Sequence, residues 1–212
     1  MIGLSPAPGD LDVLCLGAHP DDIEIGCGGT LLALRAGRRA TIRSVVLTGS
    51  ELRAQEAWNA SRAFGAADLA ISALPDGRLP AHWDDVKQTL ENVARGPRPD
   101  LILAPSPDDS HQDHRLIADL VTTTWRDALV LHYEIPKWDG DLARATHYVP
   151  LTAEQAHRKV ELLNDCFVSQ KDRDWWDDEM FLGLMRLRGI ECRAPYAEAF
   201  TAPKVLLDLA RP

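Results

Sequence analysis

The 212-residue chain is long enough for one generous domain or two small ones, and its composition is that of an ordinary globular protein. It carries 23 Lys and Arg against 32 Asp and Glu, a formal net charge of −9, and its mean hydropathy is −0.19. This acidic balance argues against nucleic-acid binding and against attachment to an anionic membrane surface, because both need a basic face. The lack of a long uncharged apolar run also argues against a membrane-spanning helix.

Four cysteines are scattered along the chain without a Cys-x-x-Cys spacing. That pattern favours neither a zinc–thiolate cluster nor a disulfide framework, and it is typical of reduced thiols buried in a cytoplasmic protein. We therefore expect a cytoplasmic protein that binds neither nucleic acid nor a membrane.

Short apolar runs alternate with helical patterns through the first two-thirds of the chain. The alternation is typical of βαβ units, so we expect an α/β fold, a Rossmann-like three-layer sandwich around a mostly parallel sheet. Strands are predicted at 11–17, 41–47, 69–74, 101–104 and 128–135, and helices at about 28–36, 52–64, 83–95 and 111–126.

Beyond residue 150 the pattern changes. Two helices are predicted, at about 152–167 and 176–188, with short strands near Tyr196 and Val205. We interpret this part, about 150–212, as an addition to a single domain that spans residues 1–212.

Two segments rich in histidine and aspartate follow two of the predicted strands directly. Ala18-His-Pro-Asp-Asp-Ile-Glu24 follows the first strand, and Ser106-Pro-Asp-Asp-Ser-His-Gln-Asp-His114 follows the fourth. These strands are neighbours in the usual order of such sheets, so the two segments should face each other at the carboxyl ends of the strands. One imidazole and one carboxylate from the first segment, with one imidazole from the second, would leave an open position for water, as a catalytic zinc site requires.

Each segment also has a plainer interpretation. On its own, His-Pro-Asp-Asp is a turn in which an Asp caps the next helix, and His-x-x-His is common at helix starts. The coincidence of both segments at the ends of adjacent strands favours the metal site. The glycines at 26, 28 and 29 do not have the spacing of a dinucleotide-binding loop, so we expect them to serve close packing.

These segments resemble the PIG-L/LmbE-like zinc-dependent N-acetylglucosaminyl deacetylase family. Its Ala-His-Pro-Asp-Asp hallmark with a glycine-rich continuation stands at 18–29, its His-x-Asp-His hallmark stands at 111–114, and Arg-x-x-Glu at 53–56 adds support. The resemblance implies one Zn²⁺ per chain, although another divalent metal could fill such a site. It also implies that zinc-activated water removes the N-acetyl group of an N-acetylhexosamine-type sugar or glycoconjugate, and it is compatible with a homo-oligomer.

The resemblance assigns roles to the matching residues. It implies that His19, Asp22 and His114 are the zinc ligands. Asp21 would be the general base that activates the water and later returns the proton to the leaving amine. His111, in protonated form, would stabilise the oxyanion of the tetrahedral intermediate.

Four further residues are candidates for supporting roles. Asp113 is expected to orient one of the imidazoles of the metal site. Arg53 and Asp76 match sugar-contacting positions of the family, and Trp138 lies in a loop where it could stack on a sugar or an aglycone. The plainer alternatives are a surface salt bridge for Arg53, a turn cap for Asp76 and packing for Trp138.

Two other functions remain open at this point. One is an amidase that uses the same zinc site on a thiol conjugate or another amide. The other is a metal-containing sugar-binding domain without turnover, which the presence of Asp21 and His111 disfavours, because binding alone needs neither a base nor an oxyanion partner.

Overall fold

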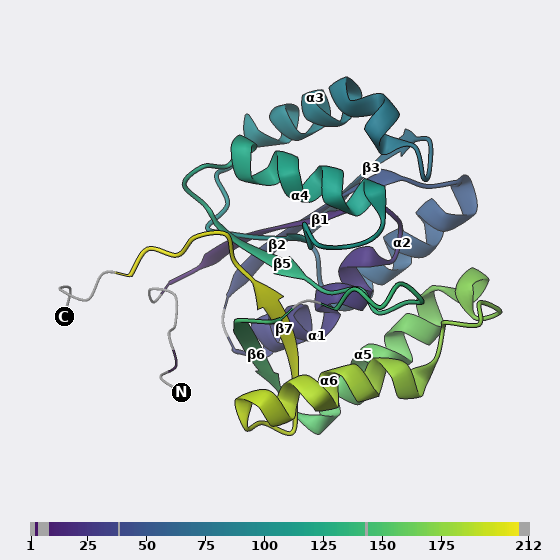
Figure 1. Ribbon diagram of the computed structural model, residues 1–212, viewed down its shortest axis with the longest axis vertical. Coiled ribbons are helices and arrows are strands. Elements are labelled where there is room, and N and C mark those ends of the chain that lie inside the picture. The colour runs from purple at the N-terminus through teal and green to yellow at the C-terminus, as the bar shows by residue number, and fades with distance from the viewer. Residues whose placement is uncertain (1–2, 4–8, 38, 143, 208–212) are drawn as a thin grey trace.

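A computed structural model describes residue 3 and residues 9–37, 39–142 and 144–207. Within them, seven strands form one sheet in the order β3-β2-β1-β4-β5-β7-β6 (Figure 1). The pairs among β1 to β5 are parallel, whereas β7 is antiparallel to both β5 and β6. The strands are β1 (Leu11–Gly17), β2 (Ala40–Thr48), β3 (Asp68–Leu74), β4 (Leu101–Pro105), β5 (Leu129–Tyr133), β6 (His147–Leu151) and β7 (Tyr196–Thr201).

Helices cover both faces of the sheet (Figure 1). Alternate residues of a strand point to opposite faces, so Val13 and Cys15 pack on the side of α1, α2, α5 and α6, while Leu14 and Leu16 pack on the side of α3 and α4. The expected three-layer α/β sandwich is therefore confirmed. The helices are α1 (Asp22–Gly37), α2 (Glu51–Phe64), α3 (Trp83–Ala94), α4 (Gln112–Thr124), α5 (Ala153–Cys166) and α6 (Asp178–Cys192), with short 3₁₀ turns η1 (Leu79–His82) and η2 (Val168–Gln170).

Three local predictions differ from the structure. The first helix begins at Asp22 rather than near residue 28, because its glycines hide the helical pattern while the acidic Asp22 suits a helix N-terminus. Strand β6 was not predicted; it is a short edge strand interrupted by Pro150, which an edge tolerates. The strand expected near Val205 is wrong, since residues 202–207 have no regular structure, but the strand near Tyr196 is confirmed as β7.

The part beyond residue 150 extends the same sheet through β7 and packs α5 and α6 on the same core. The single domain over 1–212 stays a prediction, and its last five residues lie outside the described part of the chain. In the described part, each helix is too short or too polar to span a bilayer.

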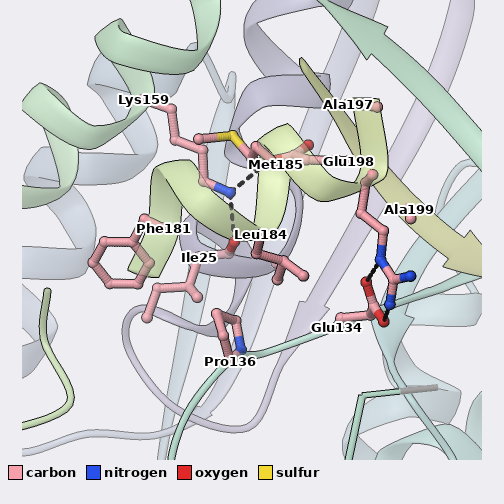
Figure 2. Close-up of a pocket in the computed structure, with 12 residues that line it drawn as sticks. Ile25, Glu134, Pro136, Lys159, Phe181, Leu184, Met185, Ala197, Glu198 and Ala199 are labelled. Carbon is pink, nitrogen blue, oxygen red and sulfur yellow. Dashed lines mark hydrogen bonds and ion pairs between the residues drawn. The ribbon is translucent and has the colours of Figure 1, made fainter. Parts of the chain in front are cut away.

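Helix α1 is broken at Cys27, where φ is −143° and ψ is 16°. One buried ion pair stabilises the break (Figure 2): Lys159 Nζ donates to Ile25 O and to Glu198 Oε1, each at 2.6 Å. The Glu198 carboxylate in turn accepts the backbone N–H groups of residues 29 and 30, at 2.8 and 2.6 Å. The Lys159 ammonium thus lies at the carbonyl end of the part of α1 before Cys27, and the Glu198 carboxylate lies at the amide end of the part after it, as the helix dipole favours. These contacts fix the position of the part of α1 that begins at Asp22.

The cavity beside this ion pair is small (Figure 2). Its volume is about 20 Å³, and it is lined by residues of α1, α5, α6 and β7 together with Glu134 and Pro136. That space holds about one water molecule. It is therefore excluded as a sugar-binding site.

The glycines of α1 serve close packing, as the sequence predicts. A Cβ atom on Gly28 would lie 2.6 Å from Phe64 Cε1, and one on Gly29 would lie 2.5 Å from Leu151 Cδ1. Both distances are too short for carbon atoms, so the helix can approach α2 and the sheet only where the side chain is a hydrogen.

Gly28→Ala tests this packing. We expect the free energy of unfolding in urea to fall by about 1–3 kcal/mol, because the added methyl group must displace the fully buried Phe64. The matched control is Gly183→Ala in α6, where a Cβ meets nothing within 4 Å. That change should raise the free energy of unfolding by about 0.4–1 kcal/mol. Equal effects of the two substitutions would contradict the packing argument.

Candidate functional site

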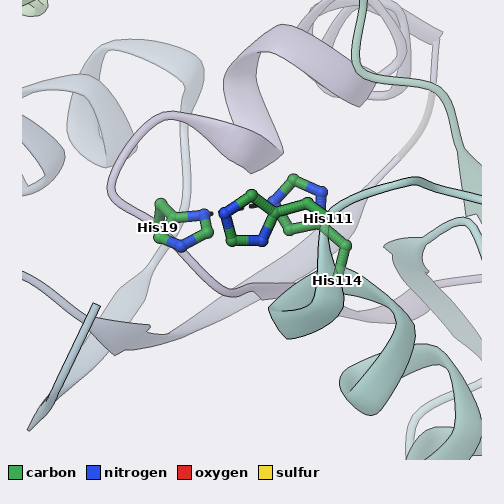
Figure 3. Close-up of side chains that lie close together, drawn as sticks. All are labelled: His19, His111 and His114. Carbon is green, nitrogen blue, oxygen red and sulfur yellow. Dashed lines mark hydrogen bonds between the residues drawn. The ribbon is translucent and has the colours of Figure 1, made fainter. Parts of the chain in front are cut away.

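The two histidine-bearing segments meet at one edge of the sheet. Strands β1 and β4 pair in parallel, with Val13 opposite Leu101, so their carboxyl ends lie side by side. The first segment leads from β1 into α1, and the second leads from β4 into α4. The rings of His19, His111 and His114 gather there (Figure 3), with centroids 4.7 to 5.1 Å apart.

Three ligand atoms form a compact triangle in this cluster. His19 Nδ1 lies 3.1 Å from His114 Nε2, and Asp22 Oδ2 lies 3.4 Å from the first and 3.2 Å from the second. Ligand atoms held at about 2.0–2.2 Å from one tetrahedral ion lie roughly 3.3 Å from each other. The donor set expected from the sequence therefore fits a single metal ion. His111 is an alternative donor, because one of its ring nitrogens and one from each of the other two histidines lie within 4.8 Å of one another.

The carboxylate of Asp22 stabilises positive charge at the centre of this triangle. Asp22 Oδ2 accepts the backbone N–H groups of Ala18 and His19, each at 2.8 Å. Burial alone would raise the pKa of Asp22, but the imidazoles of His114 and His19 hold that pKa well below its usual range. Burial would lower the pKa of both histidines, yet Asp22 and its neighbouring carboxylates raise the pKa of His19 to about 12 and that of His114 to about 9. A divalent cation suits such a site.

Carboxylates also contact the outer nitrogens of both ring ligands. Asp109 Oδ2 lies 2.8 Å from His114 Nδ1, an arrangement that directs the Nε2 lone pair toward the triangle. His19 Nε2 is buried and makes no hydrogen bond with the described residues, and oxygens of Asp76 and Asp113 lie 3.1 and 3.4 Å from it. Asp113 also accepts the N–H groups of residues 77 and 79, so it ties the loop after β3 to α4.

Asp21 occupies a different environment from its neighbour Asp22. It is buried, and its Oδ2 lies 2.7 Å from Arg53 Nη2 in the first turn of α2. Burial raises the pKa of Asp21, and Arg53 offsets only part of that rise. Arg53 is held in turn by Glu56 Oε2 at 2.9 Å and by the ring of Phe167, 5.6 Å from its guanidinium carbon. The arginine expected to contact sugar thus contacts the candidate base.

His111 caps the N-terminus of α4. Its Nδ1 accepts the backbone N–H of Asp113 at 3.3 Å, which leaves Nε2 as the nitrogen that carries the proton. Burial and the nearby histidines lower the pKa of this ring. The protonated His111 that the resemblance implies stays a prediction, and with or without a proton on Nδ1 the Nε2–H can donate a hydrogen bond.

The two outer candidates are solvent-accessible. The Asp76 side chain is 77% exposed although it contacts His19. Trp138 is 64% exposed, donates from Nε1 to Asp174 at 3.1 Å, and packs edge-on to Trp175 with the ring centroids 5.9 Å apart.

Sequence reasoning assigned no role to two residues beside the candidate metal site. Asp109 belongs to the polar segment after β4, and Lys137 contacts it from the loop after β5. In the sequence Asp109 is only one of two adjacent aspartates ahead of the His-x-x-His spacing, which does not indicate the partner of either carboxylate.

The chain is similar in sequence to proteins that are named as deacetylases. The sequence model of the family described as "PIG-L: GlcNAc-PI de-N-acetylase" matches residues 14–125, more than half of the chain. The uncharacterized deacetylase YaiS of Escherichia coli (strain K12) is 30% identical over 146 residues, which cover 63% of this chain and 78% of the relative. The diacetylchitobiose deacetylase of Thermococcus kodakarensis is 31% identical over 121 residues, 49% of this chain and 45% of that one.

A solved structure shows the same fold. The N,N'-diacetylchitobiose deacetylase from Pyrococcus horikoshii superposes with a TM-score of 0.74 at 22% identity, over 90% of this chain and 83% of that one. The family match extends over more than half of the sequence, so the chain belongs to the PIG-L family.

Proposed function

We propose that the chain is a metal-dependent N-deacetylase that hydrolyses the N-acetyl group of an N-acetylhexosamine-type sugar or glycoconjugate and releases acetate and a free amine. The observation that carries this proposal is the triangle of ligand atoms with a separate buried carboxylate, Asp21, beside it. The family description and the diacetylchitobiose deacetylase among the relatives support an N-acetylated sugar as the substrate.

His19, Asp22 and His114 would hold one Zn²⁺, and these nitrogen and oxygen donors also suit iron or cobalt. When bound, the ion supplies a Lewis acid that polarises the acetyl carbonyl and lowers the pKa of water to about 7. Asp22 begins α1 and His114 lies in the first turn of α4, whereas His19 lies in the short turn that joins β1 to α1.

Asp21 acts as the general base. Its buried carboxylate, with a raised pKa, takes a proton from the attacking water and later delivers it to the nitrogen of the leaving amine. Arg53 fixes the orientation of this carboxylate through the 2.7 Å contact. The Glu56 contact and the Phe167 ring keep the guanidinium in place, so the base does not rotate away from the substrate.

His111 stabilises the oxyanion that forms as the amide carbonyl becomes tetrahedral. The N–H of Asp113 occupies Nδ1 and orients the ring, so the Nε2–H is the donor available to the substrate oxygen. Asp76 contacts His19 with an exposed carboxylate, which would bind a sugar hydroxyl. Trp138, which is 64% exposed, would stack on the sugar or its aglycone.

Asp21→Asn keeps the size of the side chain and removes the base. We expect acetate release from a mixed panel of N-acetylhexosamine compounds to fall by about 10²–10⁴-fold in the zinc-reconstituted protein. Asp119→Asn, which changes an exposed carboxylate of α4, serves as the control and should match the wild type.

Wild-type turnover by the Asp21→Asn variant at saturating zinc would contradict the assigned base. If the wild type released no acetate but hydrolysed amides of thiol conjugates, the amidase alternative would replace the proposed substrate. Glycan binding without any hydrolysis would indicate a binding domain.

Removal of one ligand tests the metal centre. The wild type should retain one Zn²⁺ per chain after dialysis, and free zinc at 100 times Kd should stabilise it by about 2.7 kcal/mol. His114→Ala should lose most of both effects, measured by metal analysis and by thermal unfolding with and without zinc. His157→Ala, at an exposed histidine of α5, is the control. Stoichiometric zinc in the His114→Ala protein would show that the ion binds elsewhere.

A further inference from the structure

The loop after β5, residues 134–142, contacts the metal site through Lys137. Lys137 Nζ lies 3.0 Å from Asp109 Oδ1 and 3.4 Å from an oxygen of each of Asp139 and Asp141. The lysine side chain is only 10% exposed, so this is an enclosed ion pair with little of the solvent screening that weakens surface pairs.

The two carboxylate oxygens of Asp109 contact Lys137, His111 and His114. Oδ2 faces His114 Nδ1 at 2.8 Å, while Oδ1 accepts the backbone N–H of His111 at 2.7 Å in addition to the ammonium group. Asp109 itself is 4% exposed, so water has little room to replace a lost partner. Lys137 and the His111 N–H together hold Oδ1, so both contribute to the plane of this carboxylate and to the orientation of the His114 ring.

A second contact joins the same two segments. Asp141 Oδ2 accepts the backbone N–H of Ser110 at 2.6 Å and also lies beside Lys137 Nζ. The lysine is thus held from both sides, by Asp109 of the segment after β4 and by Asp141 of its own loop. Such a fixed cation can impose one orientation on Asp109.

We propose that Lys137 is a positioning residue for the metal centre, which holds His114 in its ligating orientation through Asp109. The inference rests on the proposed metal site. A partner that orients a ligating histidine typically contributes 10- to 100-fold to metal affinity.

Lys137→Met keeps the length of the side chain and removes its charge. We expect the Kd for Zn²⁺, measured by competition with a chromogenic chelator, to rise about 10- to 100-fold. Lys137→Arg should retain most of the affinity, because a guanidinium can also pair with Asp109. Lys87→Met is the matched control, since this lysine of α3 pairs with Glu91 away from the site. It should leave the Kd unchanged.

A double-mutant cycle separates positioning from a general loss of structure. In an Asp109→Asn background, the further change Lys137→Met should alter the Kd by no more than about twofold, because the link through which it acts is already broken. If Lys137→Met does not fold, Lys137→Gln provides the same cycle.

An unchanged zinc Kd in Lys137→Met, or an equal effect with and without Asp109, would overturn the role of Lys137 while leaving the metal centre intact. A wild-type protein that binds no zinc would overturn the metal centre itself.

Discussion

The carboxylate of Asp22 is buried at the point where two loops meet, and a buried charge is tolerated only when donors and opposite charges surround it. Asp22 accepts two backbone N–H groups of its own turn, and the imidazoles of His19 and His114 lie beside the same carboxylate. To supply them, β1 must end directly before the turn and α4 must begin beside it, which the parallel pairing of β1 with β4 ensures. The same arrangement that satisfies Asp22 gathers three metal donors.

Two adjacent aspartates acquire opposite properties from their surroundings. Asp22 lies among imidazoles and keeps a low pKa, whereas burial raises the pKa of Asp21 despite its contact with Arg53. Separation of pKa values between neighbouring carboxylates is how one site assigns a ligand and a base. Arg53 in turn is positioned by Glu56, which accepts the N–H and hydroxyl of Ser169 beyond α5. The segment after α5 therefore helps to hold Arg53 against the candidate base Asp21.

The sheet and the two motif segments could be predicted because strand periodicity and the usual strand order place them at one edge. The kinked start of α1 could not be predicted from the sequence, because it is stabilised by an ion pair between Lys159 and Glu198, which are 39 residues apart. Contacts between distant loops, such as that of Lys137 with Asp109, leave no periodic signal either. Arg53 was singled out by its motif, but the sequence does not show toward which partner a long side chain turns.

Anomalous diffraction at the zinc edge, recorded from crystals of the zinc-loaded protein, would locate the ion and its ligands. We expect one strong peak at about 2.0–2.2 Å from His19 Nδ1, Asp22 Oδ2 and His114 Nε2. Asp21 should remain outside the coordination sphere and in contact with Arg53. A peak that is coordinated by other residues, or that takes Asp21 as a ligand, would contradict the division of roles between the two aspartates.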